Sequence, residues 1–399
     1  MPLVFKDALF DAQWLRAAGH SSSGGAELGE CLAAARRIRE PDGESWFHAW
    51  SGLAEAVLAE AEKSRAAGRR ASALAAYLRA CNYFRAAYTF LIGAPLDPRV
   101  TEAYRRHRAA FETAVALMKP TAERVRIPYR DAKLHGYLFR AADDGARRPT
   151  LIITGGYDST AEEAYFFSGA AAVARGYTCI AFDGPGQGAA IIDDGIVFRP
   201  DWEAVVAPVV DFAMTRPEVD GSRIALMGIS FGGYLAPRAA SGEPRLAACI
   251  ADPGEFSLLE ELRSRLPAFM ARELPNGNPL LLRLLDLVLR RRMRHTTAGW
   301  GIRRGLWVHG VESPLAYLQL TRDYGLEGRA RQIRCPTLVC RAENDDIGVT
   351  ARTLHDALTC TKSFITFSAG EGAGEHCEVG ARSLFNQRAF DWLDAQLGN

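Results

Sequence analysis

The stretch that decides the fold runs from residue 224 to 240 and reads IALMGISFGGYLAPRAA. It begins as an apolar run of strand length, Ile224 to Met227, and continues from Gly233 as a helical pattern. The junction matches G-x-S-x-G and places Ser230 at its centre. Small glycines permit a sharp turn that lifts a serine hydroxyl above the end of a sheet, at a helix N-terminus that favours developing negative charge. We therefore predict that Ser230 is a nucleophile; a purely structural glycine turn is the alternative.

The segments on both sides of this motif repeat the strand-and-helix rhythm. Apolar residues alternate in Val125 to Tyr129 and in Leu134 to Leu138, which predicts the start of a β-meander with a turn at Asp131. Because most of the later strand-length runs are separated by helical patterns, we expect a doubly wound α/β domain with a mostly parallel sheet. These runs are Thr150–Thr154, Thr178–Phe182, Ile224–Met227, Ala247–Ala251, Thr337–Cys340 and Ser363–Phe367.

Two helical additions interrupt that rhythm. Residues 27–119 are rich in Ala, Leu, Arg and Glu at helical spacing, which predicts three or four helices. Leu258 to Leu289 is strongly helical and ends in the basic cluster Arg290, Arg291, Arg292 and Arg294. A solvated helix end that complements the helix dipole is favoured for this cluster over a grip on an anionic substrate or acyl carrier. The predicted division is an N-terminal helical region at 1–122, core at 123–256, a helical cap insertion at 257–325 and core again at 326–399.

Composition narrows the function. The chain has 399 residues, of which 48% are hydrophobic and 24% charged, values typical of globular proteins. Its 48 basic and 47 acidic residues give a net charge of +1, so no global field would recruit nucleic acid or an anionic membrane. No run approaches the roughly 18 apolar residues of a membrane-spanning helix. We expect the protein to act on a small molecule.

The cysteines and the N-terminal residues bear on the cellular compartment in which the protein is expected. The eight cysteines show neither C-x-x-C pairs nor zinc-like spacing, which indicates free thiols in a reducing environment. Residues 1–18 mix charged with apolar side chains and lack the apolar region of a signal peptide. We therefore expect a cytoplasmic protein.

A nucleophilic serine needs a base and a carboxylate that orients the base. The loop after the run ending at Cys340 offers Asp345, with Asp346 and Glu343 as alternatives. The loop after the last run presents His376, and no other histidine lies in a comparable position. The resulting chain order of serine, aspartate and histidine is the order found in α/β-hydrolases.

The tetrahedral oxyanion needs two donors. One is expected to be the backbone N–H of Phe231, directly after the nucleophile. The other is expected in the glycine-rich loop GGYD at 155–158, from Gly156 or Tyr157, between which the sequence does not choose.

Three neighbouring features are given other roles. Cys377 does not stand on a strand-to-helix turn like that of Ser230 and has no base of its own, so we predict that its thiol is packed in the core. Adjacent side chains cannot readily share one ion, which argues against a metal site at Glu375 to Glu378. The loop at 183–188 lacks the Lys-Ser/Thr of a P-loop and is expected to shape the floor of the pocket.

Five stretches together resemble a known group of proteins. They are NYFRAA at 82–87, GGYDST at 155–160, FDGPGQG at 182–188, the elbow at 228–234 and CPTLV at 335–339. At these residues the sequence resembles a group within the α/β-hydrolase superfamily. The group includes the 2,6-dihydroxypseudooxynicotine hydrolases, the fungal polyketide chain-shortening hydrolases and the fermentation–respiration-switch esterases. The resemblance spans about residues 46 to 395.

The resemblance implies that the N-terminal helices fold over the core as a lid, with the active site between them. Relatives in this group cleave acyl bonds, including carbon–carbon bonds beside a ketone. Some carry an additional active-site carboxylate, for which Asp252, Glu255 and Glu260 are candidates here. Relatives often have an acidic residue after the GPGQG loop, where this chain has Ala189 and Ala190.

We therefore predict a serine hydrolase with no cofactor and no metal, which cleaves an acyl bond of a small aromatic or polyketide-like ketone, ester or thioester. An acyltransferase or cyclase with the same triad is one alternative, and a catalytically silent binding protein is another. An exposed apolar face on the N-terminal helices would favour a homodimer. The expected substrate-binding residues are Tyr157, Asp158, Glu255 and Trp300.

Overall fold

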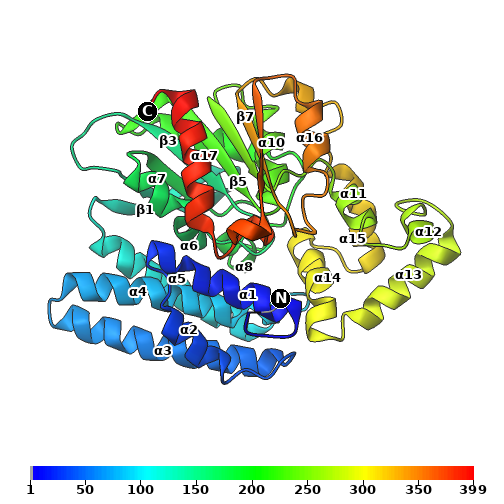
Figure 1. Ribbon diagram of the computed structural model, residues 1–399, viewed down its shortest axis with the longest axis horizontal. Helices are drawn as coiled ribbons and strands as arrows, with labels where there is room; N and C mark the ends of the chain where they lie inside the picture. Colours follow the sequence, from blue (N-terminus) through cyan, green and yellow to red (C-terminus); the bar gives the residue numbers. More distant parts are fainter. Residues whose placement is uncertain (1–2) are drawn as a thin grey trace.

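The computed structural model describes residues 3–399 and is built around one eight-stranded sheet in the order β1-β2-β4-β3-β5-β6-β7-β8 (Figure 1). β1 pairs antiparallel with β2 and β2 with β4, and all other neighbours are parallel. The predicted doubly wound, mostly parallel α/β sheet is confirmed. The strands are β1 Ala122–Tyr129, β2 Ala132–Phe139, β3 Arg148–Thr154, β4 Thr178–Phe182, β5 Val219–Ile229, β6 Ala248–Asp252, β7 Thr337–Ala342 and β8 Lys362–Phe367.

Helices cover both faces of this sheet, because alternate residues of each buried strand point to opposite sides. In β3, Leu151 and Ile153 belong to the apolar cluster shared with α6, α7 and α17. Ile152 belongs to the cluster shared with α9, α10 and α16. These helices are α6 Ala161–Ala164, α7 Ala170–Ala174, α9 Glu203–Met214, α10 Gly232–Ala240, α16 Ala351–Ala357 and α17 Arg382–Leu397.

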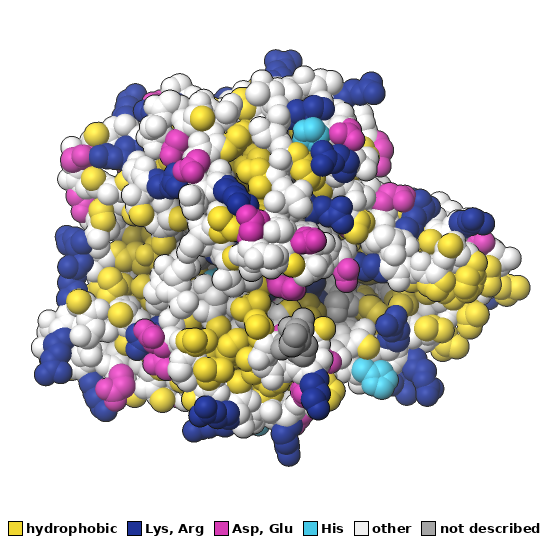
Figure 2. All heavy atoms as spheres, in the orientation of Figure 1, with side chains coloured by type: hydrophobic (Ala, Val, Ile, Leu, Met, Phe, Trp, Pro, Cys, Tyr) yellow, Lys and Arg dark blue, Asp and Glu magenta, His cyan; other side chains and the backbone are white. Residues whose placement is uncertain are grey.

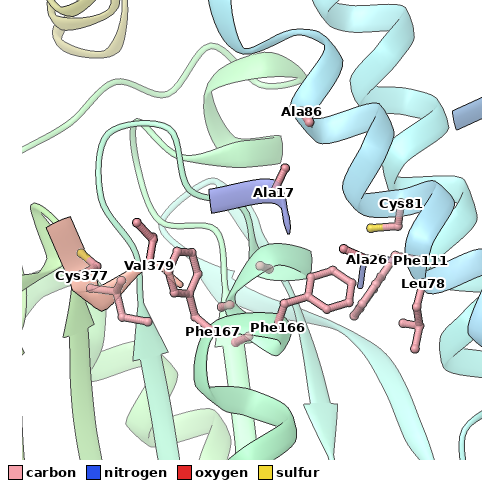
Figure 3. Packing of buried hydrophobic residues seen from close by; sticks show 14 of the residues in the cluster. Ala17, Ala26, Leu78, Cys81, Ala86, Phe111, Phe166, Phe167, Cys377 and Val379 are labelled. Carbon is pink, nitrogen blue, oxygen red and sulfur yellow. The ribbon is translucent and has the colours of Figure 1, made fainter. Parts of the chain in front are cut away.

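The N-terminal helices form a further layer against the core (Figure 1). Four helices lie in residues 27–119, as predicted, but α1 at Ala8–Gly19 precedes them and was not predicted. Figure 3 shows Phe166 of the core pointing toward Phe111 of α5, with 6.0 Å between the ring centroids. The apolar cluster is therefore continuous from the sheet into the N-terminal layer. The four predicted helices are α2 Leu28–Ala35, α3 Gly43–Ala66, α4 Arg70–Ala87 and α5 Pro98–Leu117.

The cap insertion leaves the core after β6 and returns before β7. Its two ends meet in an isolated antiparallel bridge between Ser257 and Gly325. The helical run expected from 258 to 289 is broken by Pro267 and Pro275, because proline disrupts a helix interior. The cap helices are α11 Leu258–Arg263, α12 Ala268–Ala271, α13 Pro279–Arg292, α14 Thr296–His309 and α15 Pro314–Leu320.

The most exposed apolar side chains lie on the cap. Leu280 and Leu287 of α13 are 73% and 65% exposed, and Figure 2 shows hydrophobic side chains gathered on this projecting part. The N-terminal helices, in contrast, expose only Leu28 among large apolar side chains within the described residues. The exposed apolar face that would favour a homodimer is therefore on α13 and not on the N-terminal helices, and the homodimer stays a prediction. Among helices of residues 3–399, none is long and apolar enough to cross a membrane.

Candidate active site

Ser230 stands on a tight turn between β5 and α10. Its φ of +61° lies in the left-handed region, which non-glycine residues rarely adopt. The turn needs its glycines: a Cβ on Gly228 would lie 1.8 Å from the carbonyl oxygen of Gly232, and one on Gly232 would lie 2.5 Å from that of Thr154. The Ser230 amide donates to the carbonyl of Asp252 at 2.7 Å. The chain therefore holds the serine at the carboxyl end of the sheet in a fixed, strained conformation.

The predicted base and carboxylate meet Ser230 across the ends of the strands. His376 Nε2 lies 2.9 Å from Ser230 Oγ, and its Nδ1 lies 2.7 Å from Asp345 Oδ2. Asp345 is buried, whereas Asp346 is exposed and Glu343 instead accepts a hydrogen bond from the Ala369 amide at 2.7 Å. Of the three carboxylates that the sequence left open, Asp345 is the one that contacts the histidine.

Cys377 lies beside the histidine, with its Sγ 3.4 Å from His376 Nε2. The thiol is buried, and burial raises its pKa well above the ordinary value. A thiol that holds its proton so firmly is a poor nucleophile.

The glycine-rich loop after β3 passes directly against the nucleophile. A Cβ on Gly156 would lie 2.8 Å from the Phe231 amide nitrogen and 2.9 Å from Ser230 Oγ. The Gly156 amide donates to Ser159 Oγ at 2.8 Å. The amides of Phe231 and Tyr157, in contrast, donate to no protein acceptor anywhere in residues 3–399.

The loop at 183–188 supports the glycine-rich loop from behind. Gln187 Nε2 donates to the carbonyl of Gly155 at 2.6 Å, and Gln187 Oε1 accepts from the Gly184 amide at 3.0 Å. Asp183 is buried, and burial with the nearby Glu162 carboxylate raises its pKa to about 8. None of the described residues that line the cavities at Ser230 comes from this loop. The prediction that it forms the pocket floor is therefore wrong: its buried glutamine braces the next loop instead.

Two cavities open onto Ser230. The larger, here called the cap lobe, has a volume of about 350 Å³ and is lined by Tyr157, Phe231, Glu255 and residues of the cap. The smaller, here called the α1 lobe, has a volume of about 190 Å³ and is lined by residues of α1, by Asp158 and by His376. Ser230, Arg304 and Ile347 line both lobes. Ser230 is thus reached from two sides.

Tyr157 connects the core to the cap. Its hydroxyl lies 2.9 Å from His309 Nε2 and 3.1 Å from the Tyr317 hydroxyl, and both partners belong to cap helices. Burial lowers the pKa of His309 to about 3, so the imidazole is neutral at ordinary pH. Because the hydroxyl is held in this way, the Tyr157 ring forms a wall of the cap lobe rather than a mobile arm.

Among the three candidates for an additional carboxylate, only Glu255 faces a cavity at Ser230. It is 1% exposed, its Oε1 has no hydrogen-bond partner, and burial raises its pKa well above the ordinary value. Asp252 is instead paired with Arg382 at 2.7 Å, and the carboxylate of Glu260 with Arg263 at 2.6 Å. Burial therefore favours the protonated form of Glu255, and its unpartnered Oε1 leaves a hydrogen-bonding position open beside the cap lobe.

Asp158 belongs to a buried charge cluster that the sequence did not predict. Its carboxylate contacts three guanidinium groups: Arg16 at 2.8 Å, Arg85 at 3.2 Å and Arg304 at 3.1 Å. Although burial raises the pKa of Asp158, these groups hold it well below the ordinary value. The arginines come from α1, α4 and α14, so the cluster joins the N-terminal layer and the cap to the core.

Glu163 of α6 completes this cluster, paired with Arg16 at 2.5 Å and Arg85 at 3.3 Å. Among the three arginines of the cluster, only Arg85 left a signal in the sequence, since it lies within the NYFRAA stretch. Arg16 could have been placed by recognising α1, whose N-cap Asp7 accepts hydrogen bonds from the Leu9 and Phe10 amides. Five residues make up the charge cluster: Arg16, Arg85, Asp158, Glu163 and Arg304.

Trp300 lines the α1 lobe, as expected of a substrate-binding residue. Its indole N–H donates to the carbonyl of Thr89 at 2.7 Å, which fixes the ring between the cap and the N-terminal layer. Trp46 and Trp50, in contrast, are fully buried in the N-terminal layer and line neither lobe among the described residues.

Comparison with family models and known proteins gives consistent matches. Residues 151–377 match the model described as "Alpha/beta hydrolase family", and residues 41–259 match "Esterase FrsA-like". The chain is 36% identical to the 20-hydroxy-prefusarin hydrolase FUS2 of Gibberella moniliformis, over 99% of this chain and 98% of that protein. It is 35% identical to the hydrolase acrC of Aspergillus aculeatus, over 97% and 96%. The crystal structure of a 2,6-dihydroxy-pseudo-oxynicotine hydrolase superposes with a TM-score of 0.74 at 24% identity, over 95% of both chains.

Proposed function

The chain belongs to the alpha/beta hydrolase family, and on this premise we propose that it is a serine hydrolase that cleaves an acyl bond through an acyl-enzyme on Ser230. The observation that carries the proposal is the continuous hydrogen-bonded series from Ser230 Oγ through His376 to Asp345, at 2.9 and 2.7 Å. A base within hydrogen-bond reach of a serine, and a carboxylate that orients the base, are what nucleophilic catalysis requires.

In the proposed reaction, His376 Nε2 accepts the proton of Ser230 as Oγ attacks the substrate carbonyl carbon. The amides of Phe231 and Tyr157 donate to the oxyanion that forms. We assign Tyr157 rather than Gly156 as the second donor, because the Gly156 amide is already bound to Ser159. The leaving group departs with the proton from His376, and a water molecule, activated by the same base, then releases the acid.

We further propose that the cap lobe holds the acyl part of the substrate. Its walls are mostly apolar, and Glu255 supplies one neutral carboxyl that can donate a hydrogen bond to a carbonyl or hydroxyl oxygen. A largely apolar substrate with a few oxygen atoms fits these walls. The relative FUS2 is named for 20-hydroxy-prefusarin, and this name supports an aromatic or polyketide-like class, with a ketone, ester or thioester as the reacting group.

The test is mass spectrometry of the intact protein after reaction with a fluorophosphonate probe. We expect one adduct on the wild type, none on Ser230→Ala and a slow reaction on His376→Ala. A folded wild-type protein that forms no adduct would contradict the proposal. Product analysis with a labelled ester then separates hydrolysis, which yields the free acid, from acyl transfer or cyclisation, which yields a new ester or ring.

A further inference from the structure

Arg304 of α14 has hydrogen-bonding capacity that the protein does not use. Its guanidinium group lies over the Trp300 ring at 4.0 Å and near the Tyr157 ring at 5.3 Å. Its one charge contact is Nη1 to Asp158 Oδ1 at 3.1 Å, and its buried Nε has no partner. A guanidinium group carries five N–H donors in a rigid plane. Within residues 3–399 the Arg304 side chain donates no hydrogen bond of good geometry, although it lines both lobes at Ser230.

The other two arginines of the charge cluster are committed elsewhere. Arg16 donates through Nε and Nη2 to Glu163 and through Nη1 to Asp158, at 2.8, 2.5 and 2.8 Å. Arg85 lies against the same two carboxylates. His20 also contacts Glu163, and burial lowers the pKa of this imidazole, which disfavours its charged form. The charge cluster therefore holds three arginines against two carboxylates. Arg16 lines the α1 lobe but donates three hydrogen bonds to the two carboxylates, whereas Arg304 lines both lobes and has the fewest contacts within the cluster.

A largely buried cluster with one more guanidinium group than carboxylates, and with an unpartnered Nε on Arg304, favours an anionic ligand. The α1 lobe is where that ligand fits. It contains both Arg304 and His376, and His376 is the group that returns a proton to the leaving group. Its volume of about 190 Å³ suits a group of one ring, since a cavity of about 150 Å³ accepts benzene.

We propose that Arg304 is a specificity-determining residue that binds an anionic oxygen, a carboxylate or an enolate, on the leaving group of the substrate in the α1 lobe. This inference rests on the proposed function, because it assigns the leaving group to the lobe that contains His376. The acyl part then occupies the cap lobe, next to Phe231 and Tyr157.

The two sources of the anionic oxygen differ in when the charge arises. A carboxylate is present before the reaction and contributes to binding. An enolate forms only when the bond between the acyl carbon and the leaving carbon breaks: the electron pair passes into the leaving group, its carbonyl oxygen takes the charge beside Arg304, and His376 then protonates its carbon. Planar guanidinium groups pair well with either oxygen anion.

The first experiment measures binding without catalysis. Benzoate and its neutral isostere benzamide are titrated calorimetrically into Ser230→Ala and into the double variant with Arg304→Met. We expect benzoate to bind Ser230→Ala about tenfold or more tightly than benzamide, and the Arg304→Met change to remove this difference. Equal affinities of the two compounds for Ser230→Ala would overturn the inference, and this result needs no arginine variant to fold.

The second experiment measures specificity. The substrates are 4-butanoyloxy-3-nitrobenzoate and its methyl ester, which differ only in the charge of the leaving group. We expect kcat/KM for the wild type to favour the charged ester by about tenfold, mainly through KM, and this ratio to collapse in Arg304→Met. The matched control is Arg322→Met, a cap arginine whose side chain is 55% exposed, which should leave the ratio unchanged. An unchanged ratio in folded Arg304→Met would overturn the inference.

A β-diketone substrate, benzoylacetone, distinguishes the two sources of the anionic oxygen, a carboxylate and an enolate. If the anion is an enolate, Arg304→Met should lower kcat for this substrate by about tenfold or more while KM changes little. If the anion is a carboxylate, the effect should be confined to the charged ester. Failure of the proposed function is recognised separately, by absence of the fluorophosphonate adduct, while the benzoate titration still reports on Arg304.

Discussion

The proposed catalytic triad and the charge cluster both contribute residues to the α1 lobe, but they are built in different ways. Ser230, Asp345 and His376 all follow strands of one sheet, so the parallel arrangement alone brings them to the same edge. The charge cluster draws Arg16 and Arg304 from helices nearly 300 residues apart in the chain and pairs them with a core loop. The first site is a property of the sheet, and the second exists only when all three layers are packed together.

This difference predicts that the two sites fail separately. Damage to the triad should abolish the reaction and leave the fold stable, because its members sit on elements that the sheet already fixes. Damage to the charge cluster should destabilise the fold, because buried charges without partners are left where the layers meet.

The largest effect is expected from Asp345→Asn. The amide cannot stabilise the imidazolium that forms on His376, and it favours the wrong tautomer, so kcat should fall by about 10⁴-fold. Ester hydrolysis measures the rate, and thermal unfolding should show little change in Tm. The matched control, Asp346→Asn, alters an exposed neighbour and should keep wild-type activity. Equal losses in the two variants would show that the observed contact between Asp345 and His376 is not the functional one.

The next effect is expected from Glu163→Gln. The change leaves the guanidinium groups of Arg16 and Arg85 with one carboxylate between them at a site that is 2% exposed. Breaking a buried pair of this kind lowers the free energy of unfolding by about 3 to 5 kcal/mol. Chemical denaturation measures the change, and labelling of Ser230 below the transition should remain.

Glu44→Gln provides the comparison for this prediction. Glu44 is paired with Arg99 at 2.6 Å, about as closely as Glu163 is paired with Arg16, but the Glu44 side chain is 57% exposed. The expected loss is about 0 to 1 kcal/mol. Similar losses in Glu163→Gln and Glu44→Gln would mean that the charge cluster does not join the layers.

The last prediction concerns the pH dependence of stability. Burial raises the pKa of Glu255 well above its ordinary value of 4.5, so above that pH the folded protein keeps a proton that the unfolded chain releases. The contribution of this proton to the free energy of unfolding is fully present below the ordinary pKa. It is lost as pH rises toward and through the pKa of Glu255 in the folded protein, at up to about 1.4 kcal/mol per pH unit. Glu255→Gln does not titrate, so between pH 5 and 8 the wild-type Tm should decline relative to that of the variant. Asp183, whose pKa of about 8 acts in the same direction, is present in both proteins and cancels. Parallel Tm curves would show that Glu255 is ionised in the fold.

The sequence predicted the features that local rules govern. The strands of the sheet, the elbow at Ser230 and the serine, aspartate and histidine order follow from apolar runs, glycine spacing and the loops that end strands. These rules could not decide between Asp345 and the two other carboxylates of its loop. The three differ only in where their side chains point, and the sequence does not show that direction.

The features that sequence did not predict depend on contacts between distant segments. Arg304 is one arginine among many in the cap, and nothing local distinguishes it from Arg303, which donates to backbone carbonyls of its own helical region. The role of Gln187 as a brace for Gly155 was missed for the same reason. Each depends on packing between layers rather than on a motif.

The bridge between Ser257 and Gly325 has a consequence for protein engineering. Because the cap leaves and rejoins the core at one point, it can be exchanged as a cassette for the cap of a relative without cutting the sheet. Such a chimera would inherit the donor's acyl pocket, yet two recipient positions would constrain the choice of donor. Asp158 contacts Arg304, and the Tyr157 hydroxyl contacts His309, so the donor cap must present side chains compatible with both core residues. Donor caps that carry such side chains in register are the ones suited to transplantation.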